Sequence, residues 1–169
     1  NPVLRVGEQV AEPAMVHLGV NKKDALDMAL KMFQHVGVSG DFLDRYPFEL
    51  SGGMRQRVAI AMSLITQPNL VVLDEPTSAL DPPAREQMLA YLKFFAKEHG
   101  KNILLSTHLL EDVRDICDFV VLMNNGRCLA EGKLENLISS FLNNLSNSAG
   151  ASCVSLTAVE PSRPTITRP

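Results

Sequence analysis

The 169-residue chain is long enough for one domain with a sizeable core, and 46% hydrophobic and 21% charged residues are ordinary for a globular protein. Its net charge of −3 gives no general reason to expect binding to nucleic acid, because sequence-independent binding to the phosphate backbone needs a basic face. Cys117, Cys128 and Cys153 lack CxxC spacing and are odd in number, which favours reduced thiols in a cytosolic setting. No apolar run reaches about 18 residues, so no membrane-spanning helix is predicted.

The first predicted helix covers residues 22–36. Asn21 can cap its start, Asp24 lies in the first turn, where the helix dipole favours an acidic residue, and Gly37 can end it. Apolar side chains recur at helical spacing and predict a face that packs on a neighbour: Leu26, Ala29, Leu30 and Phe33.

A second helix is predicted over residues 51–66, and a strand follows at residues 70–73. The strand residues are all aliphatic, which is typical of a central strand that is buried on both faces of a parallel sheet. The next helix begins near Pro82, with Asp81 as its cap, and ends at Gly100.

The rest of the ordered pattern alternates between strands and helices. It comprises a strand at 102–106, a short helix at 109–116, a strand at 119–123, a tight turn at 124–126 and a return strand at 127–130. This alternation predicts an α/β fold with a mostly parallel sheet. From about residue 143, Ser, Thr, Asn and Pro dominate without periodicity, so residues 143–169 are predicted to be a disordered tail.

Two carboxylates follow the predicted strand at 70–73. Open α/β sheets bind ligands at the carboxyl ends of their strands, and neighbouring side chains of an extended segment point to opposite sides. Asp74 and Glu75 can therefore do different jobs: one can hold Mg²⁺ through water, and the other can deprotonate a water aimed at a phosphoryl group. Taken alone, an aliphatic run followed by Asp-Glu is more simply explained as a strand entering an acidic turn.

His108 follows the predicted strand at 102–106. If this strand is parallel to 70–73, the imidazole lies at the same sheet edge as Glu75. A neutral imidazole there can hydrogen-bond a terminal phosphate or the attacking water. On its own, the position is more simply a lone loop histidine.

The segment LSGGMRQRVAIA opens the second helix. Ser51 can cap this helix, and Gly52 and Gly53 let the backbone approach a ligand closely. The unpaired N–H groups and the dipole of a helix start favour an anion. A plain helix cap explains Ser-Gly-Gly equally well, and the two arginines that follow are not assigned to a ligand.

The order and spacing of these motifs are far more specific than any one of them. LSGGMRQR, VVLDEP, SALD and STH follow one another and resemble the nucleotide-binding domains of ATP-binding cassette (ABC) proteins, which have a P-loop NTPase fold with a helical subdomain. The resemblance covers about residues 1–137. It implies that residues 50–57 are the signature motif, 71–75 the Walker B motif and 78–81 the D-loop.

The resemblance also implies roles for single residues and a requirement for ATP and Mg²⁺. It makes Glu75 the catalytic base and His108 the switch histidine. It further implies a metal contact from Asp74 and nucleotide contacts from four residues: Ser51, Gly52, Gly53 and Asp81.

One element of the family pattern is not found. No stretch reads GxxxxGK[ST], the loop whose backbone cradles phosphates, and Gln9 does not lie in the context of a Q-loop glutamine. We therefore expect an N-terminally incomplete ABC ATPase domain that binds ATP poorly alone. Its expected parts are residues 1–142, with a helical and signature part over about 1–66 and a Walker B to switch region over about 67–142, and the tail at 143–169.

The resemblance implies an ATP-hydrolysing transporter subunit that is peripheral on the cytoplasmic face of the cell membrane. Its expected partners are a second ABC ATPase domain, paired head to tail, and transmembrane permease subunits, with no nucleic acid. The front half resembles oligopeptide and dipeptide importer ATPases, whereas ILLSTHLLEDVRDICDFVVLMNNGRCLAEG looks more like ABC-2-type exporter ATPases. An ABC protein of DNA repair or translation and a non-catalytic interaction module are the alternatives; the transported substrate and its direction are not legible.

Overall fold

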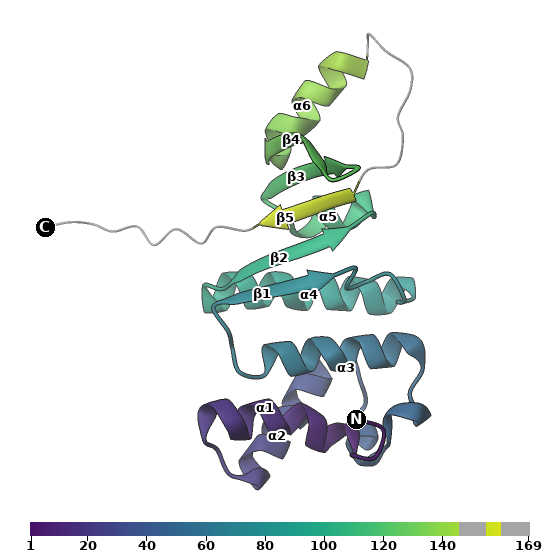
Figure 1. Cartoon of the computed structure of the whole chain (residues 1–169), viewed down its shortest axis with the longest axis vertical. Coiled ribbons are helices and arrows are strands. Elements are labelled where there is room, and N and C mark those ends of the chain that lie inside the picture. Colours follow the sequence, from purple (N-terminus) through teal and green to yellow (C-terminus); the bar gives the residue numbers. More distant parts are fainter. Residues whose placement is uncertain (146–154, 160–169) are drawn as a thin grey trace, which may run out of the picture. The chain divides into compact units, whose positions relative to one another are not determined.

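The computed structural model describes residues 1–145 and 155–159. It divides into two compact units, Asn1–Val71 with Pro76–Tyr91, and Val72–Glu75 with the chain from Leu92 onward. The elements of both units are labelled in Figure 1. Within the described ranges, no helix is both long enough and apolar enough to cross a membrane.

The first unit is built mainly from helices. Its elements are α1 (Val6–Leu18), α2 (Lys22–His35), the short 3-10 helices η1 (Gly40–Asp44) and η2 (Pro47–Glu49), and α3 (Gly52–Leu64). The predicted cap of α2 is confirmed, because the Asn21 side chain accepts the Asp24 N–H at 3.0 Å. Gly37 ends this helix region with a φ of 69°, a left-handed conformation that glycine adopts without strain.

The buried face of α2 differs slightly from the predicted one. Its buried residues are Ala25, Ala29, Met32 and Phe33. Leu30, which the periodicity placed on the packed face, is 36% exposed. The buried stripe is therefore rotated by about one residue, with Ala25 and Met32 buried where Leu26 and Leu30 were expected.

Helix α1 has no counterpart among the predicted elements. It contains Pro13, whose missing N–H and fixed ring argue against a helix interior in a sequence-based assessment. Its packed residues are mostly small, and a Cβ on Gly7 would lie 2.8 Å from the carbonyl oxygen of Leu43. Close backbone packing thus stabilises this helix despite the proline.

The strands form a five-stranded sheet in the order β1-β2-β5-β3-β4, which lies in the second unit apart from the first two residues of β1. The strands are β1 (Leu70–Asp74), β2 (Asn102–Thr107), β3 (Phe119–Asn124), β4 (Arg127–Lys133) and β5 (Ser155–Val159). Helix α4 (Pro82–His99) connects β1 to β2, α5 (Leu110–Ile116) connects β2 to β3, and α6 (Leu134–Leu145) follows β4. The predicted hairpin turn is observed, with left-handed φ angles of 48° at Asn125 and 74° at Gly126.

Strand β5 changes the character of the sheet. It pairs antiparallel with β2 on one side and with β3 on the other, and β3 pairs antiparallel with β4. These ladders differ from the mostly parallel sheet expected, because residues 155–159 run in reverse between two strands that share a direction. The prediction of a disordered tail from residue 143 also fails at two places, because α6 extends to Leu145 and residues 155–159 form β5. Main-chain pairing on both sides, rather than composition, gives β5 its extended structure. The remaining tail residues lie outside the described ranges.

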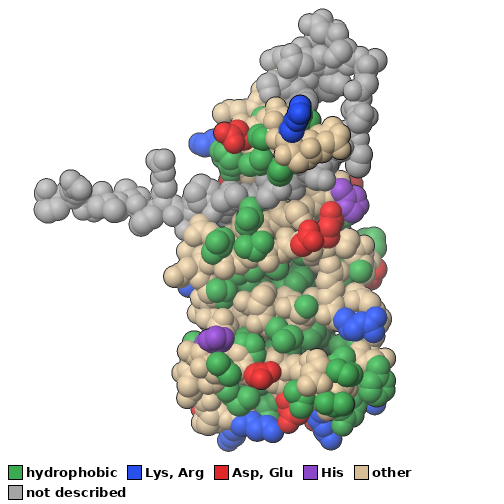
Figure 2. Space-filling view, viewed as in Figure 1, with side chains coloured by type: hydrophobic (Ala, Val, Ile, Leu, Met, Phe, Trp, Pro, Cys, Tyr) green, Lys and Arg blue, Asp and Glu red, His purple; other side chains and the backbone are tan. Residues whose placement is uncertain are grey.

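The expected burial of both faces of β1 is not observed. Val71 and Leu73 are buried, but Leu70 and Val72 are 54% and 65% exposed. Figure 2 shows that hydrophobic side chains are exposed at several places on this face of the molecule. The exposed and buried side chains alternate along β1, so among the described residues one face of this strand is packed and the other is exposed.

Candidate functional site

Glu75 follows directly after β1 and has an unusual backbone conformation. Its φ of 48° lies in the left-handed region, which costs a non-glycine residue about 1–3 kcal/mol. Its N–H donates to the carbonyl oxygen of Ser106 at 3.0 Å and to the Ser106 hydroxyl oxygen at 3.3 Å. These bonds from the end of β2 hold the strained residue in place.

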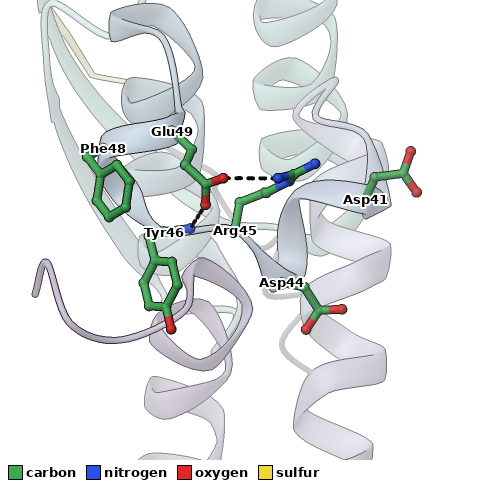
Figure 3. Close-up of a pocket in the computed structure, with 6 residues that line it drawn as sticks. All are labelled: Asp41, Asp44, Arg45, Tyr46, Phe48 and Glu49. Carbon is green, nitrogen blue, oxygen red and sulfur yellow. Dashed lines mark hydrogen bonds and ion pairs between the residues drawn. The ribbon is translucent and has the colours of Figure 1, made fainter.

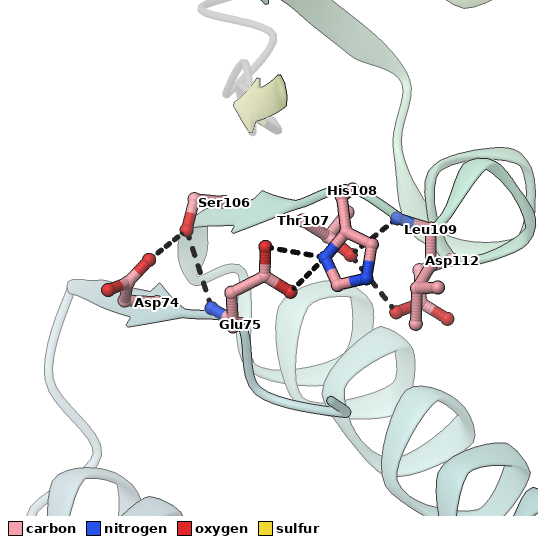
Figure 4. A network of polar contacts seen from close by, with 7 residues as sticks. All are labelled: Asp74, Glu75, Ser106, Thr107, His108, Leu109 and Asp112. Carbon is pink, nitrogen blue, oxygen red and sulfur yellow. Dashed lines mark hydrogen bonds and ion pairs between the residues drawn. The ribbon is translucent and has the colours of Figure 1, made fainter. Parts of the chain in front are cut away.

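The side chain of Glu75 meets His108. Nδ1 of His108 lies 2.9 Å from both carboxylate oxygens of Glu75 (Figure 4). Since an ionised carboxylate only accepts, Nδ1 is the donor in this pair. The side chains of His108 and Glu75 are 53% and 35% exposed, so a molecule bound at this edge can reach both.

Asp74 lies beside this pair, at the end of β1. The Ser106 hydroxyl donates to its carboxylate and at the same time accepts the Glu75 N–H, so one side chain contacts both acidic residues (Figure 4). Asp74 is exposed and offers a hard oxygen ligand, which fits Mg²⁺ because this ion keeps several waters and uses only one or two protein carboxylates. Across residues 1–145 and 155–159, no cluster of three or more His, Cys, Asp or Glu residues is placed to hold a metal.

The sequence pattern did not single out Ser106, Thr107 or Asp112, although all three surround the site. Ser106 and Thr107 are successive hydroxyl residues at the end of β2, and Thr107 contacts Asp112 of α5 (Figure 4). The available signal was the Ser-Thr pair directly before the histidine. Alternation along a strand sends two neighbouring hydroxyls to opposite sides.

In the first unit, the Ser-Gly-Gly turn begins α3. The Ser51 hydroxyl accepts the Met54 N–H at 3.3 Å, so Ser51 caps the helix. Ser51 and Gly52 are exposed, and a Cβ on Gly52 would meet nothing within 4 Å. A Cβ on Gly53 would instead lie 2.7 Å from the carbonyl oxygen of Ala79, so only glycine permits this approach.

The segment that approaches Gly53 is the one compared with a D-loop. The Ala79 N–H donates to the Gln56 side chain of α3 at 3.3 Å. Asp81 is exposed and begins α4 through its carbonyl oxygen, which accepts the Arg85 N–H at 2.9 Å. The structure thus brings Gly53 and residues 78–81 together within the first unit.

The two arginines of the LSGGMRQR motif bind the protein's own backbone. Arg55 donates to the carbonyl oxygen of Leu50 at 2.9 Å, and Arg57 donates to that of Gly37 at 2.5 Å. Arg57 Nε is buried without a hydrogen-bond partner among the described residues. Both arginines therefore support the local fold of the turn and of α2.

A shallow pocket of about 440 Å³ lies in the segment before this turn (Figure 3). It is lined by Asp41, Asp44, Arg45, Tyr46, Phe48 and Glu49. The Glu49 carboxylate accepts the Tyr46 N–H at 2.7 Å and pairs with Arg45 at 3.0 Å. The bond from the Tyr46 N–H, followed by the Arg45 contact, lowers the pKa of Glu49.

A second pocket, of about 880 Å³, lies in the second unit between α5, β3 and the start of α6. Its lining residues come from two segments of the chain: Arg114, Cys117, Asp118, Phe119, Lys133, Leu134 and Glu135. Neither pocket includes a predicted site residue. The acidic pair and His108 therefore form an open edge rather than the wall of either pocket.

Sequence comparisons agree on one family. Residues 1–78 match the ABC transporter family model. The chain is 40% identical to a peptide import ATP-binding protein of Brucella melitensis over 139 residues. The aligned region covers 81% of this chain and 41% of that protein. It is 40% identical to the oligopeptide transport ATP-binding protein OppD of Salmonella typhimurium over 139 residues, 42% of that protein. The glutathione import ATP-binding protein GsiA of the same species is 41% identical over 22% of its length.

Solved structures show the same likeness. A dimeric ATP-binding cassette in a post-hydrolysis state, bound to ADP and Pi, superposes with a TM-score of 0.74 at 29% identity over 79% of this chain and 58% of that one. An ATP-binding subunit of an ABC transporter superposes with a TM-score of 0.72 at 29% identity, over 88% and 60% of the two chains. The chain thus spans about two fifths of its peptide-import relatives and about three fifths of these cassettes.

Proposed function

We propose that the chain is an ABC transporter ATP-binding domain and serves as the ATP-binding and ATP-hydrolysing subunit of a membrane transporter, because its sequence and its fold both resemble those of such subunits. The observation that carries the proposal is the Glu75–His108 contact of 2.9 Å beside Asp74. These groups lie where two strands end at one edge of the sheet, the place where α/β folds bind ligands.

Each residue of this edge has a distinct task in the proposal. Bound ATP with Mg²⁺ supplies the terminal phosphoryl group that water attacks. Glu75 accepts the proton of that water, and its half-exposed carboxylate suits this role. His108 orients the Glu75 carboxylate through Nδ1, and Asp74 would hold the Mg²⁺ ion through its water shell.

The turn at Ser51 to Gly53 is proposed to contact the nucleotide of a second ABC ATPase domain, together with Asp81. Support comes from the exposure of Ser51 and Gly52 at the start of a 13-residue helix, whose first N–H groups have no carbonyl partner within it. The similar cassette with ADP and Pi was solved as a dimer.

We further propose that the transporter takes up peptides or related small substrates. The relatives named above are peptide, oligopeptide and glutathione import proteins, and the matches extend over 139 residues, well beyond the front half. In this proposal the subunit is peripheral on the cytoplasmic face of the cell membrane, docked to transmembrane permease subunits. The exporter-like pattern of the back half remains a prediction from the sequence.

The test is phosphate release from Mg·ATP. The 169-residue sequence contains no GxxxxGK[ST] stretch. The assay therefore uses a chimera in which a segment with this phosphate-binding loop, taken from a peptide-import relative, is joined to this chain. The Glu75→Gln variant is expected to lower the rate by about 10²- to 10⁴-fold, the usual contribution of a general base. The control is Glu98→Gln, on the exposed side of α4. Equal rates in the two variants would remove Glu75 from the role of base.

A further inference from the structure

The proposed hydrolysis makes no use of one buried carboxylate, that of Asp112. It lies in the first turn of α5 and is 0% exposed, as is Thr107 at the end of β2. Burying a carboxylate is costly unless polar partners compensate it. Its neighbours therefore indicate what the group does.

Asp112 and Thr107 are linked to each other and to Leu109 by hydrogen bonds. The Thr107 hydroxyl donates to the Asp112 carboxylate at 3.4 Å and accepts the Leu109 N–H at 3.1 Å. A hydroxyl has one donor and two acceptor positions, so donation to Asp112 orients its lone pairs toward Leu109. The Asp112 N–H in turn donates to the carbonyl oxygen of Leu109 at 3.1 Å.

These bonds replace a normal helix cap. Leu109 is the N-cap residue of α5, yet it has no side chain that could accept a hydrogen bond. The Thr107 hydroxyl binds the N–H two residues ahead, the pattern by which Ser and Thr stabilise turns. The backbone on both sides of His108 is thereby fixed.

His108 is the residue between these two anchored positions. Its Nδ1 reaches Glu75 at 2.9 Å although its side chain is 53% exposed, so little packing of its own restrains the imidazole. Figure 4 shows Glu75 on one side of the His108 imidazole and Asp112 on the other, with Thr107 close to the ring. The placement of the imidazole thus depends on the backbone that Thr107 and Asp112 hold.

We propose that Thr107 and Asp112 form a positioning clasp for His108. Asp112 orients the Thr107 hydroxyl, the hydroxyl holds the Leu109 N–H, and the fixed loop aims the imidazole at Glu75. The importance of this for hydrolysis rests on the proposed function, but the clasp itself is a matter of local geometry. Neither residue touches the reacting groups, so both are positioning residues.

The experiment follows the imidazole directly and needs no ATP. The full chain is labelled with ¹⁵N-histidine, and a His108→Gln variant assigns its signal among the four histidines. The rate at which the His108 Nδ1–H exchanges with water reports the bond to Glu75. Thr107→Val, which keeps the shape and removes the hydroxyl, is expected to raise this rate roughly tenfold, the size of one hydrogen bond's net contribution.

Thr107→Ser restores the hydroxyl and is expected to return the exchange rate to that of the unaltered chain. Thr77→Val is the matched control, because Thr77 is also buried, at 1% exposure, but lies outside the loop. A folded Thr107→Val chain with an unchanged His108 signal would overturn the clasp. If Thr107→Val does not fold, Asp112→Ala decides: in folded protein a raised His108 exchange rate supports the clasp, and an unchanged rate overturns it.

The outcomes separate the two proposals. Failure of the Glu75→Gln assay contradicts the proposed hydrolysis and leaves the exchange result intact. An unchanged exchange rate in Thr107→Val contradicts the clasp and leaves the hydrolysis standing.

Discussion

Gly52 and Gly53 are neighbours with opposite tolerance for a side chain. Open space surrounds the position of a Cβ on Gly52, whereas a Cβ on Gly53 would lie 2.7 Å from a backbone oxygen of Ala79. A backbone atom cannot move aside as the end of a flexible side chain can. The two glycines therefore serve different purposes, exposure at Gly52 and close packing at Gly53.

Gly53→Ala is expected to lower the free energy of unfolding by about 1–3 kcal/mol, the usual cost of overpacking. Gly52→Ala is expected to change it by less than about 0.5 kcal/mol, as surface substitutions usually do. Urea unfolding of both variants measures the difference. Equal losses of stability in the two would show that the approach of Ala79 to α3 is not tight.

The residues of the candidate site were only partly predictable. The order of motifs along the chain predicted Asp74, Glu75 and His108 as site residues, because ligands bind at strand ends and the spacing resembled that of a known family. Neither the left-handed backbone of Glu75 nor the bridging hydroxyl of Ser106 follows from composition or periodicity. Both arise from contacts between segments about 30 residues apart, which a local pattern does not encode.

At the scale of elements, the short helix η2 fixes the backbone that leads into α3. Glu49 accepts the N–H of Tyr46 and pairs with Arg45, so its carboxylate closes the turn that leads to Ser51. The backbone bond is the main cause of the lowered pKa of Glu49, and Arg45 adds to it. A depressed pKa stabilises the folded state above the unfolded-state pKa, about 4.3 for Glu, and this stabilisation is lost as pH falls through the folded-state value.

Glu49→Gln is therefore expected to be less stable than the unaltered chain near neutral pH, with the difference shrinking below about pH 4.3. Thermal unfolding across pH 3–7 measures this. Arg45→Gln should retain most of the pH dependence, because the Tyr46 N–H remains. A gap between Glu49→Gln and the unaltered chain that stays constant with pH would contradict the assignment.

Elements with strong local signals were predictable, and elements fixed by distant contacts were not. The cap at Asn21 and the turn at Asn125 each follow from side-chain chemistry within a few residues. Helix α1 was hidden by Pro13, and the buried stripe of α2 was rotated by its packing partners. Strand β5 was not predicted, because the sequence around it is polar and its pairing partners β2 and β3 lie far away in the chain.

At the scale of the whole chain, β5 links two strands that do not otherwise pair. It bonds β2 along Leu104 to Thr107 and β3 along Val120 to Met123. Without it, both strands would present unpaired backbone groups along an open edge. The carboxyl end of β2, which carries Ser106 and Thr107, therefore depends on a segment about 50 residues later.

A chain ended after residue 145 is expected to show faster amide hydrogen exchange in β2 and β3, because their backbone N–H groups lose partners. A chain ended after residue 159 keeps β5 and is the matched control. Exchange measured by mass spectrometry compares the two. Identical protection of residues 102–107 in both would contradict a structural role for β5.

The directions in which the Ser106 and Thr107 hydroxyls point depend on the register of β2 in the sheet. Ser106 serves the acidic pair and Thr107 serves Asp112 because successive strand residues face opposite ways. The ladder with β5 sets Ser106 opposite Thr157 and Thr107 opposite Leu156. One residue inserted in β2 ahead of Ser106 would shift the register and exchange the faces of the two hydroxyls. The hydrogen bonds of both hydroxyls would then be lost, although every side chain of the site would still be present.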